Sequence, residues 1–133
     1  MKALAYFFLF LGHFSFSTVI AQDIAQAGAA KVKFETLSHD FGDISQGDVV
    51  KTTFVLTNEG GSALIINNVA TTCGCTAPIW PRQPIEPGKK AEIVVQFDSR
   101  GKMGIQNKIV TIYSNSETPQ VRLRISANVL PKE

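Results

Sequence analysis

Apolar and polar residues alternate with a period of two through most of the chain from residue 31 onward. The clearest run is 121–129, where five apolar residues alternate with Arg122, Arg124, Ser126 and Asn128. This pattern is typical of a half-buried β-strand, and it puts the two arginines on the solvated face. The same reasoning predicts strands near 32–36, 49–57, 64–69, 91–97 and 108–113.

Turn-forming residues separate these runs, most clearly at Asn58-Glu59-Gly60-Gly61 and at Pro87-Gly88. Pro87-Gly88 suits the central positions of a type II turn. No ten-residue stretch of this region shows a convincing helical period. Roughly seven short strands at regular spacing predict an all-β sandwich or barrel.

The N-terminus has a different composition. Lys2 precedes an apolar run, and Val19-Ile20-Ala21 suits a signal-peptide cleavage site. A membrane anchor is the alternative, but spanning takes about 20 predominantly apolar residues, and Gly12, His13 and nearby hydroxyl residues interrupt this run. We therefore predict a signal peptide over 1–21, a flexible spacer over 22–30 and one domain over 31–133.

Export follows from that prediction, to the periplasm or the medium. No cysteine stands at the cleavage point, so a lipoprotein anchor is not indicated. The formal net charge of the whole chain is +2 and its charges are scattered. Neither a basic stripe for nucleic acid nor a basic amphipathic helix for a membrane surface is visible. We expect no nucleic-acid partner and no membrane span once the signal is removed.

Catalytic patterns are also missing from the sequence. His39 beside Asp40 is the only histidine after the signal peptide, and no nucleophile signature accompanies it. The acidic residues are dispersed, and neither Gly-Lys pair has a P-loop frame. We predict a protein that is not an enzyme and needs no cofactor.

Several short motifs follow one another in a distinctive order: His39-Asp40-Phe41-Gly42-Asp43-Ile44, Asn58-Glu59-Gly60, Cys73-Gly74-Cys75-Thr76, Ile85-Glu86-Pro87-Gly88 and Ser114-Asn115. In this the chain resembles the bacterial family called domain of unknown function 1573, which is abundant in Bacteroidota. The resemblance covers about residues 33–130. It implies an exported immunoglobulin-like β-sandwich, here of about seven antiparallel strands, and no firm activity.

Cys73 and Cys75 are the only cysteines of the chain, and three interpretations compete. A Cys73–Cys75 disulfide is favoured in an oxidising compartment, with Gly74 allowing the tight ring. So small a loop adds little stability, which makes a redox role a legitimate hypothesis. Two thiolates also suit Cu(I), with only His39 and Met103 as further soft or imidazole ligands. The third interpretation is a pair of inert buried thiols.

The stretch 76–84 is predicted to be a loop and the best partner-binding surface, because Ile79, Trp80 and Arg82 stand among three prolines. An alternative is that Trp80 folds back to cap the sandwich. The favoured function is thus a non-enzymatic binding or structural module of the cell envelope, with an unidentified protein or envelope partner. The alternative is a thiol-active protein that uses Cys73 and Cys75 as a redox disulfide or a Cu(I) ligand pair.

Overall fold

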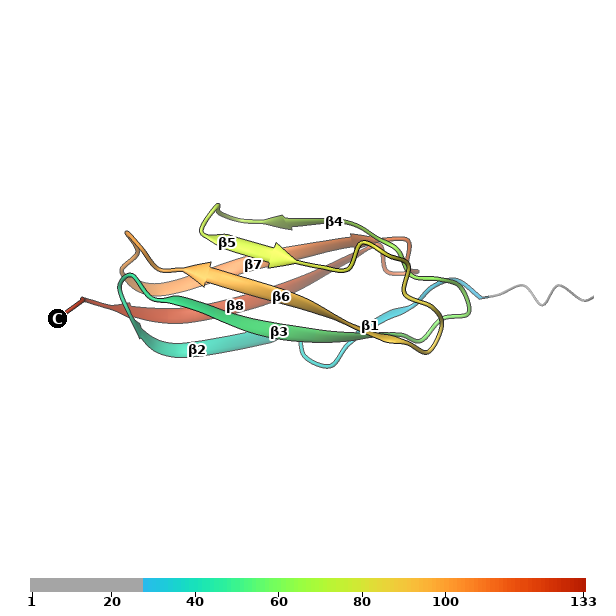
Figure 1. Cartoon of the computed structure of the whole chain (residues 1–133), viewed down its shortest axis with the longest axis horizontal. Helices are drawn as coiled ribbons and strands as arrows, with labels where there is room; N and C mark the ends of the chain where they lie inside the picture. The colour runs from blue at the N-terminus through green and yellow to red at the C-terminus, as the bar shows by residue number, and fades with distance from the viewer. Residues whose placement is uncertain (1–27) are drawn as a thin grey trace, which may run out of the picture.

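The computed structural model describes residues 28–133, which form eight strands and no helix. The strands make two four-stranded sheets that pack face to face (Figure 1). Sheet A has the order β1-β3-β6-β5, and sheet B has the order β2-β8-β7-β4. The bounds are β1 Val32–Phe34, β2 Ser38–Ser45, β3 Val49–Asn58, β4 Ile66–Thr71, β5 Thr76–Ile79, β6 Lys90–Asp98, β7 Gly104–Ser114 and β8 Gln120–Leu130.

The core lies between the sheets and is built from the inward-facing residues of the alternating runs. Leu123 and Ile125 of β8 are at most 1% exposed, and so are Phe54 and Leu56 of β3. Each such side chain contributes about 1.5–3 kcal/mol when it is fully removed from water. The predicted β-sandwich is therefore confirmed, and its central strands are those with the strictest alternation.

Two strands differ from the sequence prediction. Ser38–Ser45, where the alternation predicted no strand, forms β2 and pairs in parallel with β8, so the sandwich is not wholly antiparallel. The register shifts between Asp40 and Asp43, where Gly42 has a φ of +69°. This bulge breaks the alternation that would otherwise have revealed the strand. The second difference is β5, which occupies the first half of the predicted loop 76–84.

The observed bounds of two further strands also differ from the predicted ones. The run predicted at 64–69 becomes β4 at Ile66–Thr71, and the run predicted at 108–113 extends to Gly104–Ser114. The turn prediction at Pro87-Gly88 is confirmed, since Lys89 N–H donates to the Glu86 carbonyl over 3.0 Å and Gly88 has a φ of +77°.

The folded unit begins earlier than residue 31. Ala30 is 2% exposed, and its carbonyl accepts a hydrogen bond from Glu117 N–H. The Gly28 carbonyl accepts another from the Ser62 hydroxyl. Residues 28–30, predicted as the end of the spacer, thus pack on the sandwich. The predicted signal peptide lies outside the described residues, and residues 28–133 contain no helix that could cross a membrane.

Candidate functional site

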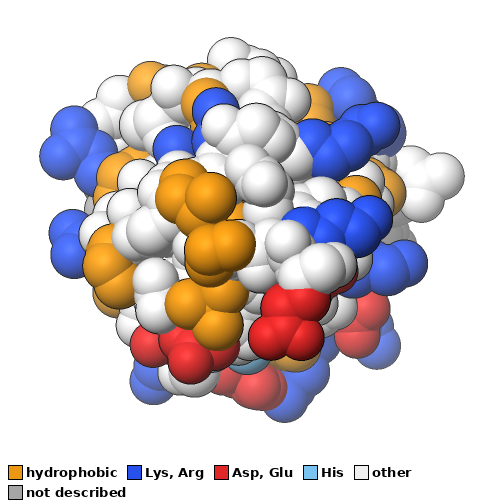
Figure 2. All heavy atoms as spheres, turned by 90° about the vertical axis from the view of Figure 1, so that its left-hand side faces the viewer, with side chains coloured by type: hydrophobic (Ala, Val, Ile, Leu, Met, Phe, Trp, Pro, Cys, Tyr) orange, Lys and Arg blue, Asp and Glu red, His pale blue; other side chains and the backbone are white. Residues whose placement is uncertain are grey.

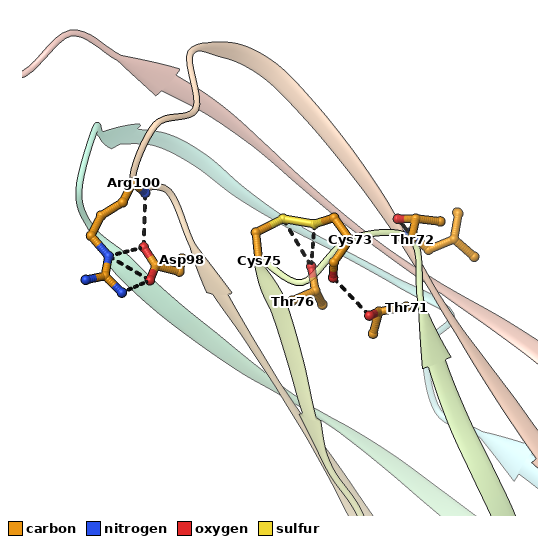
Figure 3. Close-up of a disulfide and its surroundings, with 8 residues drawn as sticks. Thr71, Thr72, Cys73, Cys75, Thr76, Asp98 and Arg100 are labelled. Atoms are coloured by element: carbon orange, nitrogen blue, oxygen red, sulfur yellow. Dashed lines mark hydrogen bonds and ion pairs between the residues drawn. A yellow bond between two sulfur atoms is a disulfide. The ribbon is translucent and has the colours of Figure 1, made fainter.

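The two cysteines lie in the turn that carries the chain from β4 at the edge of sheet B to β5 at the edge of sheet A. Thr76 N–H donates to the Cys73 carbonyl over 3.3 Å, which closes a four-residue turn. The Thr71 hydroxyl donates to the same carbonyl over 3.0 Å. Figure 3 shows both threonines directed toward the turn. The threonines around the cysteines thus fix the crossover between the sheets.

Cys73 and Cys75 form a disulfide with a Cα–Cα distance of 5.3 Å, as the sequence predicts. Both residues are half-buried, and Cys75 packs against the core. The hydroxyl oxygen of Thr76 lies 3.8 Å from Cys73 Sγ and 4.0 Å from Cys75 Sγ (Figure 3). Thr76 itself is 4% exposed. One buried hydroxyl therefore stands beside both sulfurs, where it can donate to a thiolate if the bond is reduced.

The reason given for Gly74 from the sequence is wrong. Its φ lies outside the left-handed region, and a Cβ placed on it would have no heavy atom within 4 Å. The turn therefore closes without the left-handed φ for which glycine is favoured. Gly74 is exposed at the tip, so it leaves the disulfide uncovered rather than making it possible.

An ion pair flanks the disulfide, and sequence reasoning missed it. Asp98 N–H donates to the Cys75 carbonyl over 2.9 Å, and the Arg100 guanidinium pairs with the Asp98 carboxylate (Figure 3). These hydrogen bonds from Arg100 lower the pKa of Asp98 below 3.8. The signal available in the sequence was an acidic residue that ends one strand two positions before an arginine. Because the two charges cancel, the Asp98–Arg100 pair places no net charge beside the turn.

Ile79, Trp80 and Arg82 lie together where β5 ends. Ile79 is 65% exposed on the outer face of sheet A, whereas Trp80 is half-buried against the core. The Arg82 guanidinium lies 3.8 Å from the centre of the Trp80 ring, a cation–π stack. Trp80 Nε1 is buried and finds no acceptor within residues 28–133. The indole thus supports the Arg82 guanidinium from below, and Ile79 is the apolar side chain that faces water.

The edge of β5 is poorly suited to strand addition. Asp98 N–H bonds to the Cys75 carbonyl, so Cys75, Ala77 and Ile79 direct their backbone toward β6 and the residues between them face the free edge. Of those, Thr76 already donates its N–H to the Cys73 carbonyl within the turn, and Pro78 has no N–H. This edge offers acceptors without donors, so a partner would have to contact side chains here.

A metal site receives no support from the described residues. Within residues 28–133, no three His, Cys, Asp or Glu side chains are grouped to hold an ion. His39 lies on β2, which β8 and β7 separate from β4 and the cysteine turn, and its ring packs against Phe41 at 4.6 Å. Met103 is 53% exposed in the loop before β7. The two extra ligands considered from the sequence are thus on separate elements.

Fold and site together define a small β-sandwich of the immunoglobulin-like class with a disulfide turn between its sheets. The chain belongs to the family described as "Protein of unknown function (DUF1573)", whose model matches residues 32–129. A comparison with curated proteins finds no match.

Solved structures show the same fold at low sequence identity. A protein of unknown function from Porphyromonas gingivalis W83 is 19% identical with a TM-score of 0.67, covering 77% of this chain and 48% of that one. The ASH/PapD-like domain 7 of human CEP192 is 13% identical, also with a TM-score of 0.67, covering 92% and 100%. The secreted serine protease VesC from Vibrio cholerae is 14% identical with a TM-score of 0.57, covering 80% and 24%. The chain spans about half the length of the Porphyromonas structure. These likenesses show the fold alone.

Proposed function

We propose that the protein is an exported, non-enzymatic binding module of the bacterial cell envelope, and that it contacts a partner protein with Ile79, Trp80 and Arg82. The observation that carries this proposal is the Arg82 guanidinium stacked on Trp80 beside a 65% exposed isoleucine. Arginine and aromatic residues dominate the energetics of protein interfaces. A stacked guanidinium has already lost much of its conformational freedom, so binding costs less entropy.

The chemistry of this surface defines the partner. Arg82 takes part in none of the ion pairs found within residues 28–133. Its N–H groups therefore remain available for a carboxylate. Ile79 supplies an apolar contact next to it. The matching surface combines an acidic side chain with an apolar one.

Photocrosslinking in the cell envelope tests the proposal. A photoreactive residue at position 79 should give a discrete adduct, and Arg82→Ala should reduce its yield at least tenfold, since losing an interface arginine costs about 1.4–2 kcal/mol or more. The same residue at position 53, on the outer face of β3 in the same sheet, is the control site. Equal labelling from positions 53 and 79, or a chain retained in the cytoplasm, would refute the proposal.

A redox role is the second candidate, and the half-buried disulfide beside the Thr76 hydroxyl favours it. In that role a dithiol client would attack the bond. The Cys73–Cys75 disulfide would gain two electrons and two protons and become a dithiol, and the client's two thiols would become its disulfide. Equilibration in glutathione buffers, followed by alkylation and mass measurement, tests it. A bond that stays oxidised across physiological buffers excludes this role. Binding of Cu(I) by the reduced pair is measured on the same sample.

A further inference from the structure

The outer face of sheet B carries two arginines, Arg122 and Arg124, that form no ion pair with any residue of the described part of the chain. Arg122 and Arg124 alternate with buried residues of β8, so both point outward on the same side. They line an open hollow of about 750 Å³ together with Leu37, Ile109 and Thr111. None of the described residues that line this hollow is acidic, so they leave its positive charge uncompensated.

The opposite half of the same face is acidic. Asp40 and Asp43 of β2 line a second hollow with Ile105, Ser126 and Asn128. Their carboxylates accept neutral hydrogen bonds, Asp40 from Gly42 N–H and Asp43 from the Asn128 amide, both over 2.9 Å. The Gly42 N–H, with the Ser126 side chain, lowers the pKa of Asp40. Among the described residues neither carboxylate pairs with a lysine or arginine, and only His39 adds a smaller coulombic attraction at Asp40.

An apolar side chain stands at this acidic end. Ile105 is 71% exposed and pairs with Asn128 at the beginning of β7. Figure 2, which views the end of the sandwich where β7 begins, shows hydrophobic side chains gathered next to acidic ones. Ile105 therefore adds exposed apolar area beside the two carboxylates of this face.

The strand register places the two acidic residues at one end of this face and the two arginines at the other. Asp40 is level with Ser126, Asp43 is level with Asn128, and Arg124 and Arg122 follow toward the other end. Consider a two-fold axis that runs parallel to the sheet and perpendicular to the strands, between the levels of Arg124 and Ser126. In the second copy this rotation reverses the order of the residues along the strands. It brings Asp40 beside the level of Arg124 and Asp43 beside that of Arg122 in a second copy. The same rotation carries Ile105 to the level of Thr111, at the hollow.

We propose that two copies of this chain associate through the outer faces of their B sheets, with Asp40 and Asp43 of each copy opposite Arg124 and Arg122 of the other. A two-fold interface must be self-complementary. This face meets that condition because its negative charges lie at one end and its positive charges at the other. Sheets pack face to face about 10 Å apart, a separation that arginine and aspartate side chains span together. The interface is largely polar and exposed at its rim, so salt weakens it.

Sedimentation equilibrium of the purified protein tests the dimer. Wild type should dimerise, with a dissociation constant that increases at least severalfold between low and high salt. Arg122→Glu/Arg124→Glu should weaken the dimer at least tenfold. Lys51→Glu/Lys89→Glu, the same charge change at exposed lysines outside this face, should leave it unchanged. A monomeric wild type, or equal effects of both double variants, would overturn the proposal.

Mixing provides the sharper measurement. Asp40→Arg/Asp43→Arg should also be monomeric, yet an equimolar mixture with Arg122→Glu/Arg124→Glu should form a heterodimer because every opposed pair regains opposite charges. Ile105→Ser, which leaves β2 and its bulge intact, should weaken the wild-type dimer if the aspartate variant does not fold. If Arg122→Glu/Arg124→Glu instead leaves self-association unchanged and abolishes binding of a poly-glutamate peptide, the face serves an acidic partner and the dimer is refuted. The dimer face lies on sheet B, whereas Ile79 and Arg82 lie at the end of β5 in sheet A. A failure of the dimer would therefore leave the proposed function untouched, and the reverse also holds.

Discussion

Asn58 connects more of the molecule than any residue of the candidate site. It is fully buried, and its amide nitrogen donates to the carbonyls of Ser62 and Ile85 over 2.8 and 2.9 Å. Its amide oxygen accepts from Gly60 N–H at 3.0 Å and from Lys31 N–H at 3.3 Å. A buried polar side chain is stable only when it is hydrogen-bonded, and here both ends of the amide are used. Asn58 therefore ties the β3 turn to the N-terminal segment and to the chain before β6.

Replacing Asn58 with Asp tests this arrangement. Asn58→Asp keeps the acceptor but removes both donors, so the Ser62 carbonyl loses this bond and the Ile85 carbonyl keeps only the one from Leu64 N–H, while a carboxylate replaces a fully buried amide. We expect the free energy of unfolding to decrease by about 3 kcal/mol or more, since a buried group without its hydrogen bond costs about 1–3 kcal/mol and a charged group costs more. Urea unfolding followed by the fluorescence of Trp80, the single tryptophan, measures it. Asn68→Asp on exposed β4 is the control, and equal stability of the two variants would contradict the assignment.

Residue patterns predicted different parts of the site to different extents. Cys73–Cys75 was predicted as a disulfide because the chain has no other cysteine and export favours oxidation. The Asp98–Arg100 pair and the four hydrogen bonds of the Asn58 side chain were not predicted. Asn58 was assigned only to a turn, because its role depends on carbonyls that are distant in sequence. Long-range partners of a side chain leave no local pattern to detect.

At the scale of elements, Gly60 and Gly74 differ although both stand in turns. A Cβ on Gly60 would lie 2.7 Å from Ala30 Cα and closer still to the Ala29 carbonyl oxygen. Gly60→Ala should therefore force the N-terminal segment away and decrease stability by about 2–3 kcal/mol. Gly74→Ala meets no atom and should increase stability by about 0.5 kcal/mol through the unfolded state. Thermal unfolding of the two variants measures the contrast, which a similar effect of both would disprove.

The disulfide turn should matter little for stability. A cross-link over so few residues removes about 1.6 kcal/mol of unfolded-state entropy in the loop-closure model. Cys73→Ala/Cys75→Ala should therefore lower the free energy of unfolding by no more than about that amount. Chemical denaturation of this variant and of the reduced wild type should agree. A loss above about 3 kcal/mol would show that the bond stabilises the fold after all and would weaken the redox candidate.

The two strands that were mispredicted share a physical cause. Prediction relied on alternation, which works where one face of a strand is buried and its register is regular, as in β3, β6 and β8. β2 contains a bulge at Gly42, and only Ile44 is buried. β5 is four residues long and includes Pro78, which argues for a loop unless the strand is at an edge. Edge strands are the elements for which pattern alone carries least information.

For the whole molecule, the buried interface between the sheets sets the architecture, while charges on its surface adjust its response to pH. The pKa of Asp98 is lowered by hydrogen bonds from Arg100, and that of Asp40 by the Gly42 N–H. Both carboxyls have ordinary values near 3.8 in the unfolded chain. The folded protein therefore binds fewer protons than the unfolded chain as the pH approaches that value.

The sign of the pH dependence follows from this difference. The stabilisation from both carboxylates is present above the unfolded value of 3.8 and is lost as the pH falls through their lower folded values. The melting temperature should accordingly fall more steeply in wild type than in Asp98→Asn between about pH 5 and about pH 2. Glu92→Gln, at an exposed carboxylate on β6, should retain the wild-type slope. Parallel curves for wild type and Asp98→Asn would show that the Asp98–Arg100 pair beside the disulfide turn contributes nothing to stability, and that the disulfide, the Thr71 hydroxyl and the backbone hydrogen bonds hold the turn without it.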